Sequence, residues 1–296
     1  MEKHGRIIKG IAGFYYVRTE DDSLYECKAR GSFRNEKKKP LVGDYVTISI
    51  LDEEKKTGSL DQIRERKNEL IRPLVANVDQ AIVIFAIKSP APNFMLLDTF
   101  LARMELAGIG SIICFNKIDL DVDGSLQKEI NEIYEPLYPV IFASTKTGEG
   151  VDVLKGYLQK KCSTVAGPSG VGKSSLINML QVRTQMETGG ISQKTERGRH
   201  TTRHSELIEV EKDTYILDTP GFTSLRLSEI QPEELENFYP DFAPYLKHCY
   251  YQGCSHVAEE DCGVREAFLA GKIEKIRYEG YCAIWKELKE MQESVR

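Results

Sequence analysis

The chain has 296 residues, enough for two or three domains, and its 41% hydrophobic and 29% charged residues are typical of a globular protein. No apolar run approaches the roughly 20 residues needed to cross a bilayer, and the first residues lack a secretory signal. We therefore expect a cytoplasmic monomer without a membrane partner. The net charge of −5 excludes nucleic-acid binding through the field of the whole molecule, so any contact with RNA needs a local basic patch.

Residues 1–70 contain five short β-prone runs separated by turn-forming Gly, Asp and Pro. Their spacing predicts a five-stranded β-barrel of the oligonucleotide-binding type (OB-fold). The loop at residues 30–39 is basic and contains Phe33. It is either an ordinary solvated loop or the RNA-binding loop of the barrel, and the sequence leaves both interpretations open. The five runs are residues 6–9, 14–18, 24–27, 45–48 and 60–63.

Residues 71–226 alternate buried strands with helices, which predicts an α/β domain with a mostly parallel sheet covered by helices on both faces. The expected strands are residues 80–86, 111–115, 140–143, 164–166, 207–210 and 215–217, and the expected helices are residues 97–107, 126–134, 151–160 and 173–180.

Residues 167–174, Gly-Pro-Ser-Gly-Val-Gly-Lys-Ser, match the phosphate-binding loop G-x-x-x-x-G-K-[ST] between a strand and a helix. The glycines allow backbone N–H groups to converge on phosphates at a helix N-terminus. Lys173 would neutralise the β- and γ-phosphates, which makes it a catalytic residue, and Ser174 would bind Mg²⁺. We predict that this loop binds the nucleotide through Gly167, Ser169, Gly170, Val171, Gly172, Lys173, Ser174 and Ser175.

The phosphate loop alone does not separate ATP from GTP, but the run Asn116-Lys117-Ile118-Asp119 does. The Asp119 carboxylate can accept hydrogen bonds from N1–H and the 2-amino group of guanine, neither of which adenine offers. Sites built on such pairs reject the analogue by as much as ~10⁴–10⁵-fold. The Lys117 stem would lie over the base. Backbone N–H groups of the loop Ser144, Thr145 and Lys146, at the end of the next strand, would bind the guanine carbonyl.

Asp218-Thr219-Pro220-Gly221 ends another apolar strand. Asp218 would hold Mg²⁺ through water, and the Gly221 N–H would contact the γ-phosphate. A threonine between the two motifs must complete the Mg²⁺ shell, and both Thr201 and Thr202 are candidates. We favour Thr202 because Arg-His follows it, as in other GTPases with a Thr-Thr-Arg segment.

Phe222 stands where many GTPases place a water-orienting glutamine, and a phenyl ring cannot orient water. His200 can accept a proton or a hydrogen bond near neutral pH, so it is the candidate catalytic group. The alternative is that His200 is an ordinary exposed loop histidine.

The motifs occur in a permuted order, because the base-reading motifs at residues 116–119 and 144–146 precede the phosphate loop. A circular permutation explains this order without a change of fold. The segment after Gly221 then leads directly into the C-terminal domain, so movement at the γ-phosphate can be transmitted along the chain.

Residues 227–296 are helical and acidic, and they contain Cys249-x4-Cys254-x-His256-x5-Cys262. Three thiolates and one imidazole suit tetrahedral Zn²⁺ and leave no open position, so we predict one structural zinc in a small domain with little core of its own. The alternative is three buried thiols and a surface histidine. His248 is a second possible ligand, although it adjoins Cys249. The remaining cysteines, Cys27, Cys114, Cys162 and Cys282, are expected to be packing residues.

The sequence resembles the bacterial circularly permuted GTPases that depend on the small ribosomal subunit, the ribosome biogenesis GTPase A family. The resemblance covers essentially the whole chain. It rests on residues 41–44 (Leu-Val-Gly-Asp), 69–73 (Glu-Leu-Ile-Arg-Pro), 76–80 (Ala-Asn-Val-Asp-Gln) and 198–202 (Gly-Arg-His-Thr-Thr), on the permuted motifs and on the metal pattern. One departure is Thr145, where the family usually has Ala, and it is harmless if only the backbone is used.

The resemblance implies an OB-fold, a GTPase domain and a zinc domain, with a histidine, here His200, in place of the glutamine. It also implies a GTP-dependent switch in late maturation of the small (30S) subunit. Such a switch binds the particle and its rRNA in the GTP state and leaves after subunit-stimulated hydrolysis to GDP. The alternative is an RNA-binding guanine-nucleotide sensor with negligible turnover, although Lys173, Ser174 and Asp218 together favour hydrolysis. A GTPase acting on transfer RNA or at a membrane would need a modification domain or an amphipathic anchor, and neither is seen here.

Overall fold

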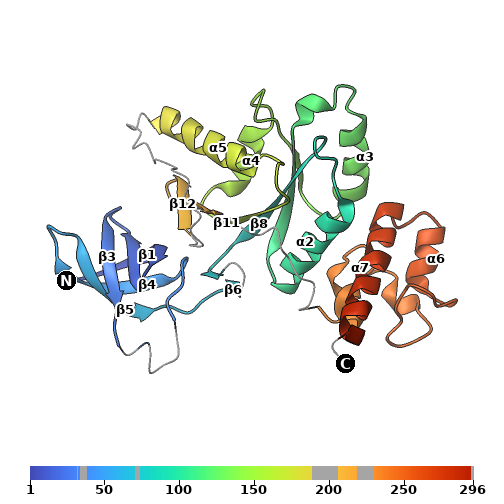
Figure 1. Cartoon of the computed structure of the whole chain (residues 1–296), viewed down its shortest axis with the longest axis horizontal. Coiled ribbons are helices and arrows are strands. Elements are labelled where there is room, and N and C mark those ends of the chain that lie inside the picture. Colours follow the sequence, from blue (N-terminus) through green and yellow to red (C-terminus); the bar gives the residue numbers. More distant parts are fainter. Residues whose placement is uncertain (32, 34–38, 71–73, 189–205, 219–229, 295–296) are drawn as a thin grey trace. The chain divides into compact units, whose positions relative to one another are not determined.

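The computed structural model describes residues 1–31, 33, 39–70, 74–188, 206–218 and 230–294, and the chain folds into two compact units (Figure 1). Each unit combines segments that are distant in the sequence. The first consists of Met1–Gln80, Lys155–Val165 and Ser174–Phe222, and the second of Ala81–Leu154, Ala166–Lys173 and Thr223–Arg296. Among the described residues, no helix is long and apolar enough to cross a membrane.

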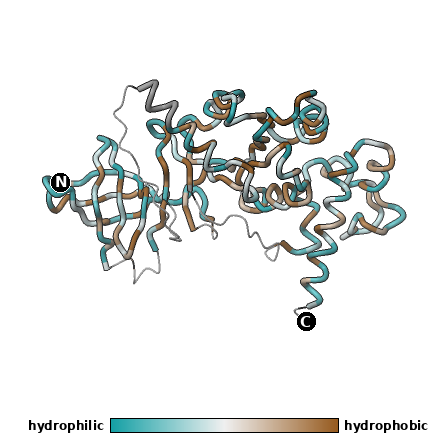
Figure 2. Tube along the Cα trace, turned by 45° about the horizontal axis from the view of Figure 1, so that its top comes forward, coloured by the Kyte–Doolittle hydropathy of each residue, from teal (hydrophilic) through white to brown (hydrophobic). Residues whose placement is uncertain are grey.

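Five strands of the first unit close into a barrel with the order β1-β2-β3-β5-β4, and β4 pairs again with β1. Neighbouring strands are antiparallel except β3 and β5, which are parallel. Buried and more exposed residues alternate along β3 and β5, so one side of each strand forms the barrel core (Figure 2). Each predicted run lies within one strand, which confirms the barrel. The strands are β1 (Glu2–Ile11), β2 (Phe14–Thr19), β3 (Leu24–Ala29), β4 (Tyr45–Asp52) and β5 (Thr57–Ile63).

A buried joint fastens the barrel to the short hairpin of β6 (Glu69–Leu70) and β7 (Val75–Ala76) that follows it. Arg6 donates from Nε to the Gly43 carbonyl at 3.2 Å and from Nη2 to the Asn77 carbonyl at 2.7 Å. Gly43 has φ +93°, and a Cβ there would lie 2.0 Å from the Ala76 oxygen, so only glycine fits. The Asn77 side chain joins the same contact, because its Nδ2 donates to the Gly43 carbonyl at 3.1 Å. This joint gives a structural reason for the Gly at residue 43 and the Asn at residue 77 in two of the segments that carry the family resemblance.

Three further strands of the first unit continue its sheet in the order β11-β13-β12-β1. β11 (Cys162–Ala166) and β13 (Thr214–Asp218) are parallel, whereas β12 (Glu206–Glu211) is antiparallel to β13 and to β1. β11 is buried along its whole length. β12 is antiparallel to β13 because the two strands form a tight hairpin, so the predicted parallel sheet ends at β13.

The second unit contains the strand order β10-β9-β8, with β9 and β10 parallel. Every residue of β8 is buried, as expected for a strand covered on both faces. The predicted strands and helices of the α/β region agree with the structure within a few residues at each end, except that the helix predicted for residues 173–180 continues to Thr188. The elements of the second unit are β8 (Gln80–Ala86), α2 (Phe94–Leu106), β9 (Gly110–Asn116), the 3₁₀ turn η1 (Ile118–Leu120), α3 (Ser125–Tyr134), β10 (Val140–Phe142) and the first half of α4 (Val151–Leu158). The helix after β11, α5 (Lys173–Thr188), belongs to the first unit from Ser174 on.

The C-terminal module consists of η3 (Pro232–Phe238), η4 (Leu246–His248), α6 (Gly263–Leu269) and α7 (Lys275–Ser294). The prediction that this region has little core of its own was wrong. Leu235, Tyr239, Phe242, Tyr281 and Ile284 are almost fully buried in one cluster, which also takes in Ala102 of α2. Several members of the cluster are aromatic. The helical spacing of apolar residues predicts which face of one helix is buried, but it does not show that rings from separate segments meet in one core.

A buried ion-pair network joins α7 to α2. Arg277 is 1% exposed and donates from Nη1 to Asp98 Oδ1 at 2.5 Å and from Nη2 to Asp241 Oδ1 at 2.8 Å. The Tyr134 hydroxyl also donates to Asp98 Oδ1, at 3.0 Å. A Cβ at Gly280 would lie 2.8 Å from Asp98 Oδ2, so glycine allows this turn of α7 to approach α2 closely. Both helices belong to the second unit.

Candidate functional site

The predicted phosphate loop links β11 to α5 and has glycine where a side chain cannot fit. Gly167 has φ +139°, and a Cβ there would lie 2.0 Å from the Ile84 carbonyl oxygen. Gly172 has φ +94°, and its Cβ would lie 2.2 Å from Asn116 Nδ2. Ser174 and Ser175 are exposed in the first turn of α5. The loop is therefore a backbone-lined turn at a helix N-terminus, the arrangement that favours anions.

Lys173 folds back over this loop. Its Nζ donates to the Gly167 carbonyl at 2.8 Å and to the Pro168 carbonyl at 2.5 Å. Partial burial lowers the pKa of Lys173 from its usual value. The ammonium group thus lies within the turn, where the predicted role requires it.

Asn116 connects the three predicted nucleotide-binding segments. It is fully buried at the end of β9, and its Nδ2 donates to the Val171 carbonyl at 2.8 Å. Its Oδ1 accepts a hydrogen bond from the Thr145 backbone N–H at 3.3 Å. The next residue, Lys117, has φ +66° and donates from Nζ to the Gly170 carbonyl at 2.7 Å. Segments far apart in sequence are therefore held together by direct contacts within one unit.

Asp119 lies in η1, and two residues of the loop at 144–146 contact its carboxylate. Ser144 Oγ donates to Asp119 Oδ1 at 2.6 Å, and Lys146 Nζ lies 3.7 Å from Oδ2. The hydrogen bond from Ser144, helped by the charge of Lys146, lowers the pKa of Asp119. An ionised carboxylate only accepts hydrogen bonds, which suits a ligand that presents two N–H donors. Ser144 Oγ also accepts from the Lys146 backbone N–H at 3.2 Å, so the whole loop is ordered around one hydroxyl.

Asp218 is the last residue of β13, next to the strand that leads into the phosphate loop. Parallel strands end at the same edge of a sheet, so its backbone position agrees with the prediction. Its side chain lies outside what the structure describes. The same holds for the other predicted residues of the two switch segments, His200, Thr201, Thr202 and Gly221, and for Phe222.

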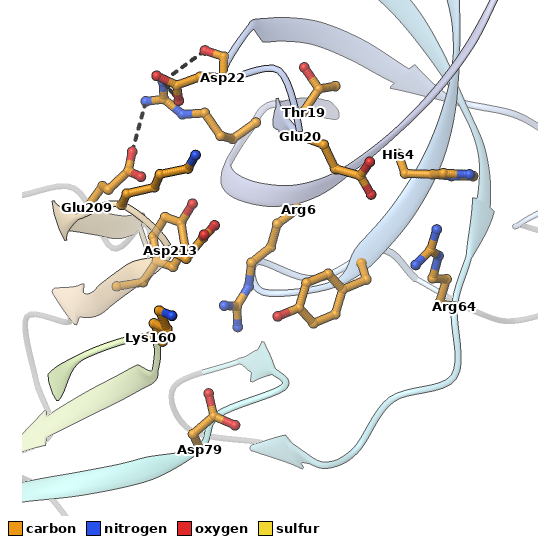
Figure 3. A pocket seen from close by; sticks show the side chains of 15 residues that line it. His4, Arg6, Thr19, Glu20, Asp22, Arg64, Asp79, Lys160, Glu209 and Asp213 are labelled. Carbon is orange, nitrogen blue, oxygen red and sulfur yellow. Dashed lines mark hydrogen bonds and ion pairs between the residues drawn. The ribbon is translucent and has the colours of Figure 1, made fainter. Parts of the chain in front are cut away.

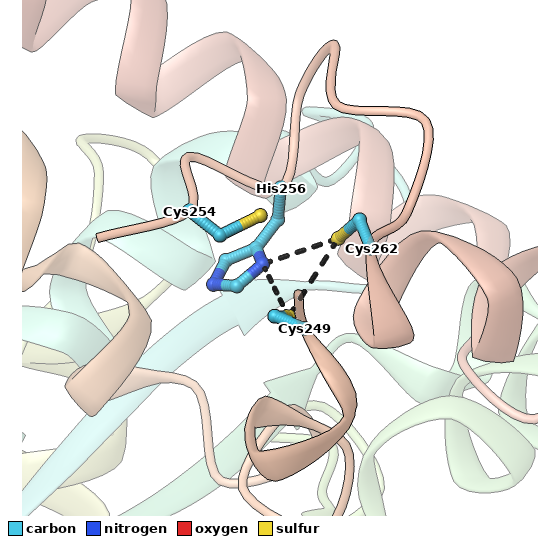
Figure 4. Close-up of side chains that lie close together, drawn as sticks. All are labelled: Cys249, Cys254, His256 and Cys262. Atoms are coloured by element: carbon cyan, nitrogen blue, oxygen red, sulfur yellow. Dashed lines mark hydrogen bonds between the residues drawn. The ribbon is translucent and has the colours of Figure 1, made fainter. Parts of the chain in front are cut away.

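The four predicted metal ligands converge in the C-terminal module (Figure 4). Their ligand atoms all lie within 4.8 Å of one another. His256 Nδ1 is 3.5 Å from Cys249 Sγ and 3.3 Å from Cys262 Sγ, and these two sulfurs are 4.0 Å apart. Zn–S and Zn–N bonds of about 2.3 and 2.0 Å in a tetrahedron place ligand atoms about 3.5–3.8 Å apart. The spacing therefore fits a single tetrahedral ion.

The chemistry of the donors also fits a cation. Burial raises the pKa of the Cys254 thiol to about 12 and raises that of Cys262. Several thiolates at this place therefore need a positive charge at their centre. His248 is exposed and is not part of the cluster, so it is not the ligand. As predicted, the four remaining cysteines are packing residues: Cys27, Cys114 and Cys162 are buried and Cys282 is partly buried.

One ligand partner was not predicted. Glu236, on η3, lies with Oε2 2.5 Å from His256 Nε2, the ring nitrogen that faces away from the sulfurs. Glu236 precedes His256 by 20 residues in an acidic stretch with several other glutamates. Nothing in the sequence distinguishes it from them.

The barrel carries a cavity of 660 Å³ lined in part by residues of the basic loop, for which the sequence left a solvated loop and an RNA-binding loop both open. Its lining includes Phe14 and Tyr15 and the basic residues Lys28, Arg30 and Lys39. Lys28 Nζ lies 4.8 Å from the centre of the Phe14 ring. Phe33 also lines the cavity, although it is only 7% exposed.

A second cavity of the first unit, 290 Å³ in volume, lies between barrel strands and the β12–β13 hairpin (Figure 3). Arg6 lies in it, with its guanidinium carbon 4.9 Å from the centre of the Tyr45 ring. Arginines and lysines in the lining are matched one for one by carboxylates, and Arg18 pairs with both Asp22 and Glu209. This balance of charge does not favour a polyanion, unlike the cavity beside the basic loop.

Comparisons with known proteins agree on one family. A family model of the RsgA GTPase matches residues 63–228, and one of the RsgA N-terminal domain matches residues 4–59. The small ribosomal subunit biogenesis GTPase RsgA of Agathobacter rectalis is 55% identical over 299 residues, covering 97% of this chain and 99% of its own. The protein of the same name from Alkaliphilus metalliredigens is 46% identical over 286 residues, covering 96% and 97%.

Two solved structures share the fold over nearly the whole chain. YjeQ from Thermotoga maritima superposes with a TM-score of 0.85 at 35% identity, covering 97% of this chain and 99% of its own. YloQ, a circularly permuted GTPase, has a TM-score of 0.81 at 36% identity, covering 98% and 96%. The permuted order predicted from the motifs is thereby confirmed. The predicted domain boundaries after residues 70 and 226 stay predictions.

Proposed function

The chain belongs to the RsgA family of GTPases, and from this premise we propose that it is a GTP-dependent switch in late maturation of the small ribosomal subunit. It is a GTP hydrolase of ribosome biogenesis. In the proposed cycle it binds the subunit and its rRNA in the GTP state and leaves after the subunit has stimulated hydrolysis. The relatives that share its family are named for biogenesis of that subunit.

The observation that supports nucleotide binding at this site most directly is the double contact of Asn116. It joins the phosphate loop through Val171 to the base-reading loop through Thr145. A nucleotide spans these two loops, because its phosphates and its base lie at opposite ends. We therefore assign the base to Asp119, Lys117 and residues 144–146, and the phosphates to residues 167–175.

The remaining roles follow from the chemistry of phosphoryl transfer. Lys173 supplies charge to the β- and γ-phosphates, and Ser174 binds Mg²⁺ together with Thr202 and, through water, Asp218. Thr201 is the alternative to Thr202. Gly221 offers its N–H to the γ-phosphate, and His200 orients the attacking water.

In the C-terminal module, Cys249, Cys254, His256 and Cys262 hold one structural Zn²⁺.

The barrel supplies the RNA contact in this proposal. The cavity of 660 Å³ combines the Phe14 and Tyr15 side chains with the amines of Lys28 and Lys39. Aromatic rings and cations together bind single-stranded nucleic acid without needing a particular sequence. Arg30 pairs with Asp61 at 2.8 Å, so we assign the phosphate contacts to the two lysines.

Replacing Asp119 by Asn should weaken GTP binding by about 100-fold or more, because each hydrogen bond to a charged group contributes about 1.5–3 kcal/mol. The same change should strengthen binding of xanthosine triphosphate, whose 2-carbonyl accepts from an amide. Fluorescent nucleotide titrations measure both affinities. Asp123→Asn is the matched control, because Asp123 is exposed nearby and only caps Ser125. An Asp119→Asn protein with normal GTP affinity would refute the base assignment.

The competing function is an RNA-binding sensor of guanine nucleotides with negligible turnover. GTP hydrolysis measured with and without purified small subunits separates the two, and large subunits serve as the control. We expect small subunits, but not large subunits, to stimulate hydrolysis. The protein should co-sediment with small subunits in the presence of a nonhydrolysable GTP analogue and should be released from them in the presence of GDP. Subunit binding that does not depend on the nucleotide, or hydrolysis that does not depend on the subunit, contradicts the proposed switch.

A further inference from the structure

The Glu236 carboxylate is placed to control the metal site without touching the metal. The side of His256 that carries Nδ1 faces Cys249 and Cys262 (Figure 4). The side that carries Nε2 faces Glu236. The His256 ring is 1% exposed, so water does not reach Nε2 freely. A neutral imidazole that gives Nδ1 to a metal carries its proton on Nε2. That buried N–H needs an acceptor, and Glu236 Oε2 lies 2.5 Å from Nε2.

The position of Glu236 is fixed by the local structure of η3. This turn begins with Pro232, and a capping box joins Gln231 to Glu234. Leu235 anchors the turn in the hydrophobic cluster and is fully buried. The carboxylate therefore approaches His256 from a rigid element, not from a flexible loop.

The backbone around His256 is also held in place. The Tyr278 hydroxyl donates to the His256 carbonyl at 2.8 Å, and the Tyr281 hydroxyl donates to the Ser255 carbonyl at 3.1 Å. His256 itself has φ +59°, a left-handed conformation that residues other than glycine seldom adopt. Two tyrosines of α7 thus hold the backbone that carries the His256 side chain, and the ring itself is contacted by Glu236 and the sulfurs.

We propose that Glu236 is a positioning residue of the metal site, which fixes His256 in the tautomer that binds zinc through Nδ1 and thereby links the metal to η3. A carboxylate behind a histidine ligand orients the ring and raises its basicity, and loss of such a partner typically costs ~10–100-fold in metal affinity. The inference rests on metal binding at the cluster and is independent of GTP hydrolysis.

Glu236→Ala in the full-length protein should bind zinc ~10–100-fold more weakly, as measured by competition with a chromophoric chelator. The Co²⁺-substituted variant should show shifted d–d bands, because the imidazole is no longer held in one orientation. Glu233→Gln is the matched control, since it alters an exposed carboxylate of the same turn that pairs with Lys289. The control should keep wild-type affinity and spectrum, and all variants should bind GTP normally.

Wild-type zinc affinity and an unchanged Co²⁺ spectrum in Glu236→Ala overturn the proposal, as does an equal loss in the control. A ¹⁵N NMR spectrum of the zinc-loaded wild-type protein gives a test that needs no variant. We expect His256 with Nδ1 bound to metal and a slowly exchanging proton on Nε2. A metal-bound Nε2 refutes the assignment, even where the alanine variant fails to fold. A failure of the proposed function appears instead in nucleotide binding and turnover.

Discussion

Replacing Arg277 by Met should lower the free energy of unfolding of the C-terminal module by about 3–5 kcal/mol at pH 7. The side chain of Asp98 is completely buried and relies on Arg277 and Tyr134 for its hydrogen bonds. Without the guanidinium, a carboxylate stays in the core with no positive charge beside it. Trp285, the one tryptophan of the chain, lies in α7, so its fluorescence in urea reports the unfolding of this module.

Two variants show whether the loss comes from the buried charge. Lys275→Met removes an exposed cation of the same helix, whose partner is Glu279, and should change stability by less than about 1 kcal/mol. Adding Asp98→Asn to Arg277→Met should recover a large part of the loss, because it removes the charge of the fully buried carboxylate and leaves only Asp241, whose side chain is 11% exposed, without its partner. Equal losses in Arg277→Met and Lys275→Met, or no recovery in the double variant, contradict the explanation.

The effect should also depend on pH. Burial raises the pKa of Asp98 to about 6, although Arg277 and Tyr134 oppose the shift. Without Arg277 the folded-state pKa rises further, whereas an unfolded Asp titrates near pH ~4. Between these two values the folded chain binds more protons than the unfolded chain, so stability falls as the pH rises. The loss caused by Arg277→Met should therefore be smaller at pH 5 than at pH 8.

Local patterns were enough to predict most of the fold. The run Gln80–Ala86 is continuous and apolar, and the structure has a buried strand with those bounds. The direction of β12 could not be predicted, because a short run of mostly apolar residues such as Leu207–Val210 suits either direction. What decides it is the turn at Lys212 and Asp213, which brings β12 back beside β13.

Contacts between residues far apart in the chain could not be predicted from the sequence. Arg277 and Asp98 are 179 positions apart, and each reads as an ordinary charged residue on a helix. Asn116 was predicted as part of a nucleotide-binding motif, but its amide is used to join two loops. Glu236 has no feature that separates it from neighbouring glutamates. Each of these roles depends on burial, and burial follows from the packing of several elements together.

His200→Ala should reduce subunit-stimulated GTP turnover by about 10²–10⁴-fold, the range of a positioned acid–base group. Phe222 takes the place of the usual water-orienting glutamine and cannot hold water, so another group must do so. Of the two histidines between the phosphate loop and Asp218, His200 directly precedes the threonines proposed for Mg²⁺. The γ-phosphate and the attacking water lie next to that ion.

The second of these histidines, His204, supplies the matched control, because it lies in the same segment on the far side of Thr202. His204→Ala should keep stimulated turnover within a few-fold of wild type. Both variants should bind GTP and the subunit normally, since neither step needs the imidazole, so single-turnover hydrolysis on preformed complexes isolates the chemical step. Full stimulated turnover in His200→Ala would mean that the water is oriented by another switch residue or by the ribosome. An equal loss in both variants would instead point to the folding of the whole segment on the subunit.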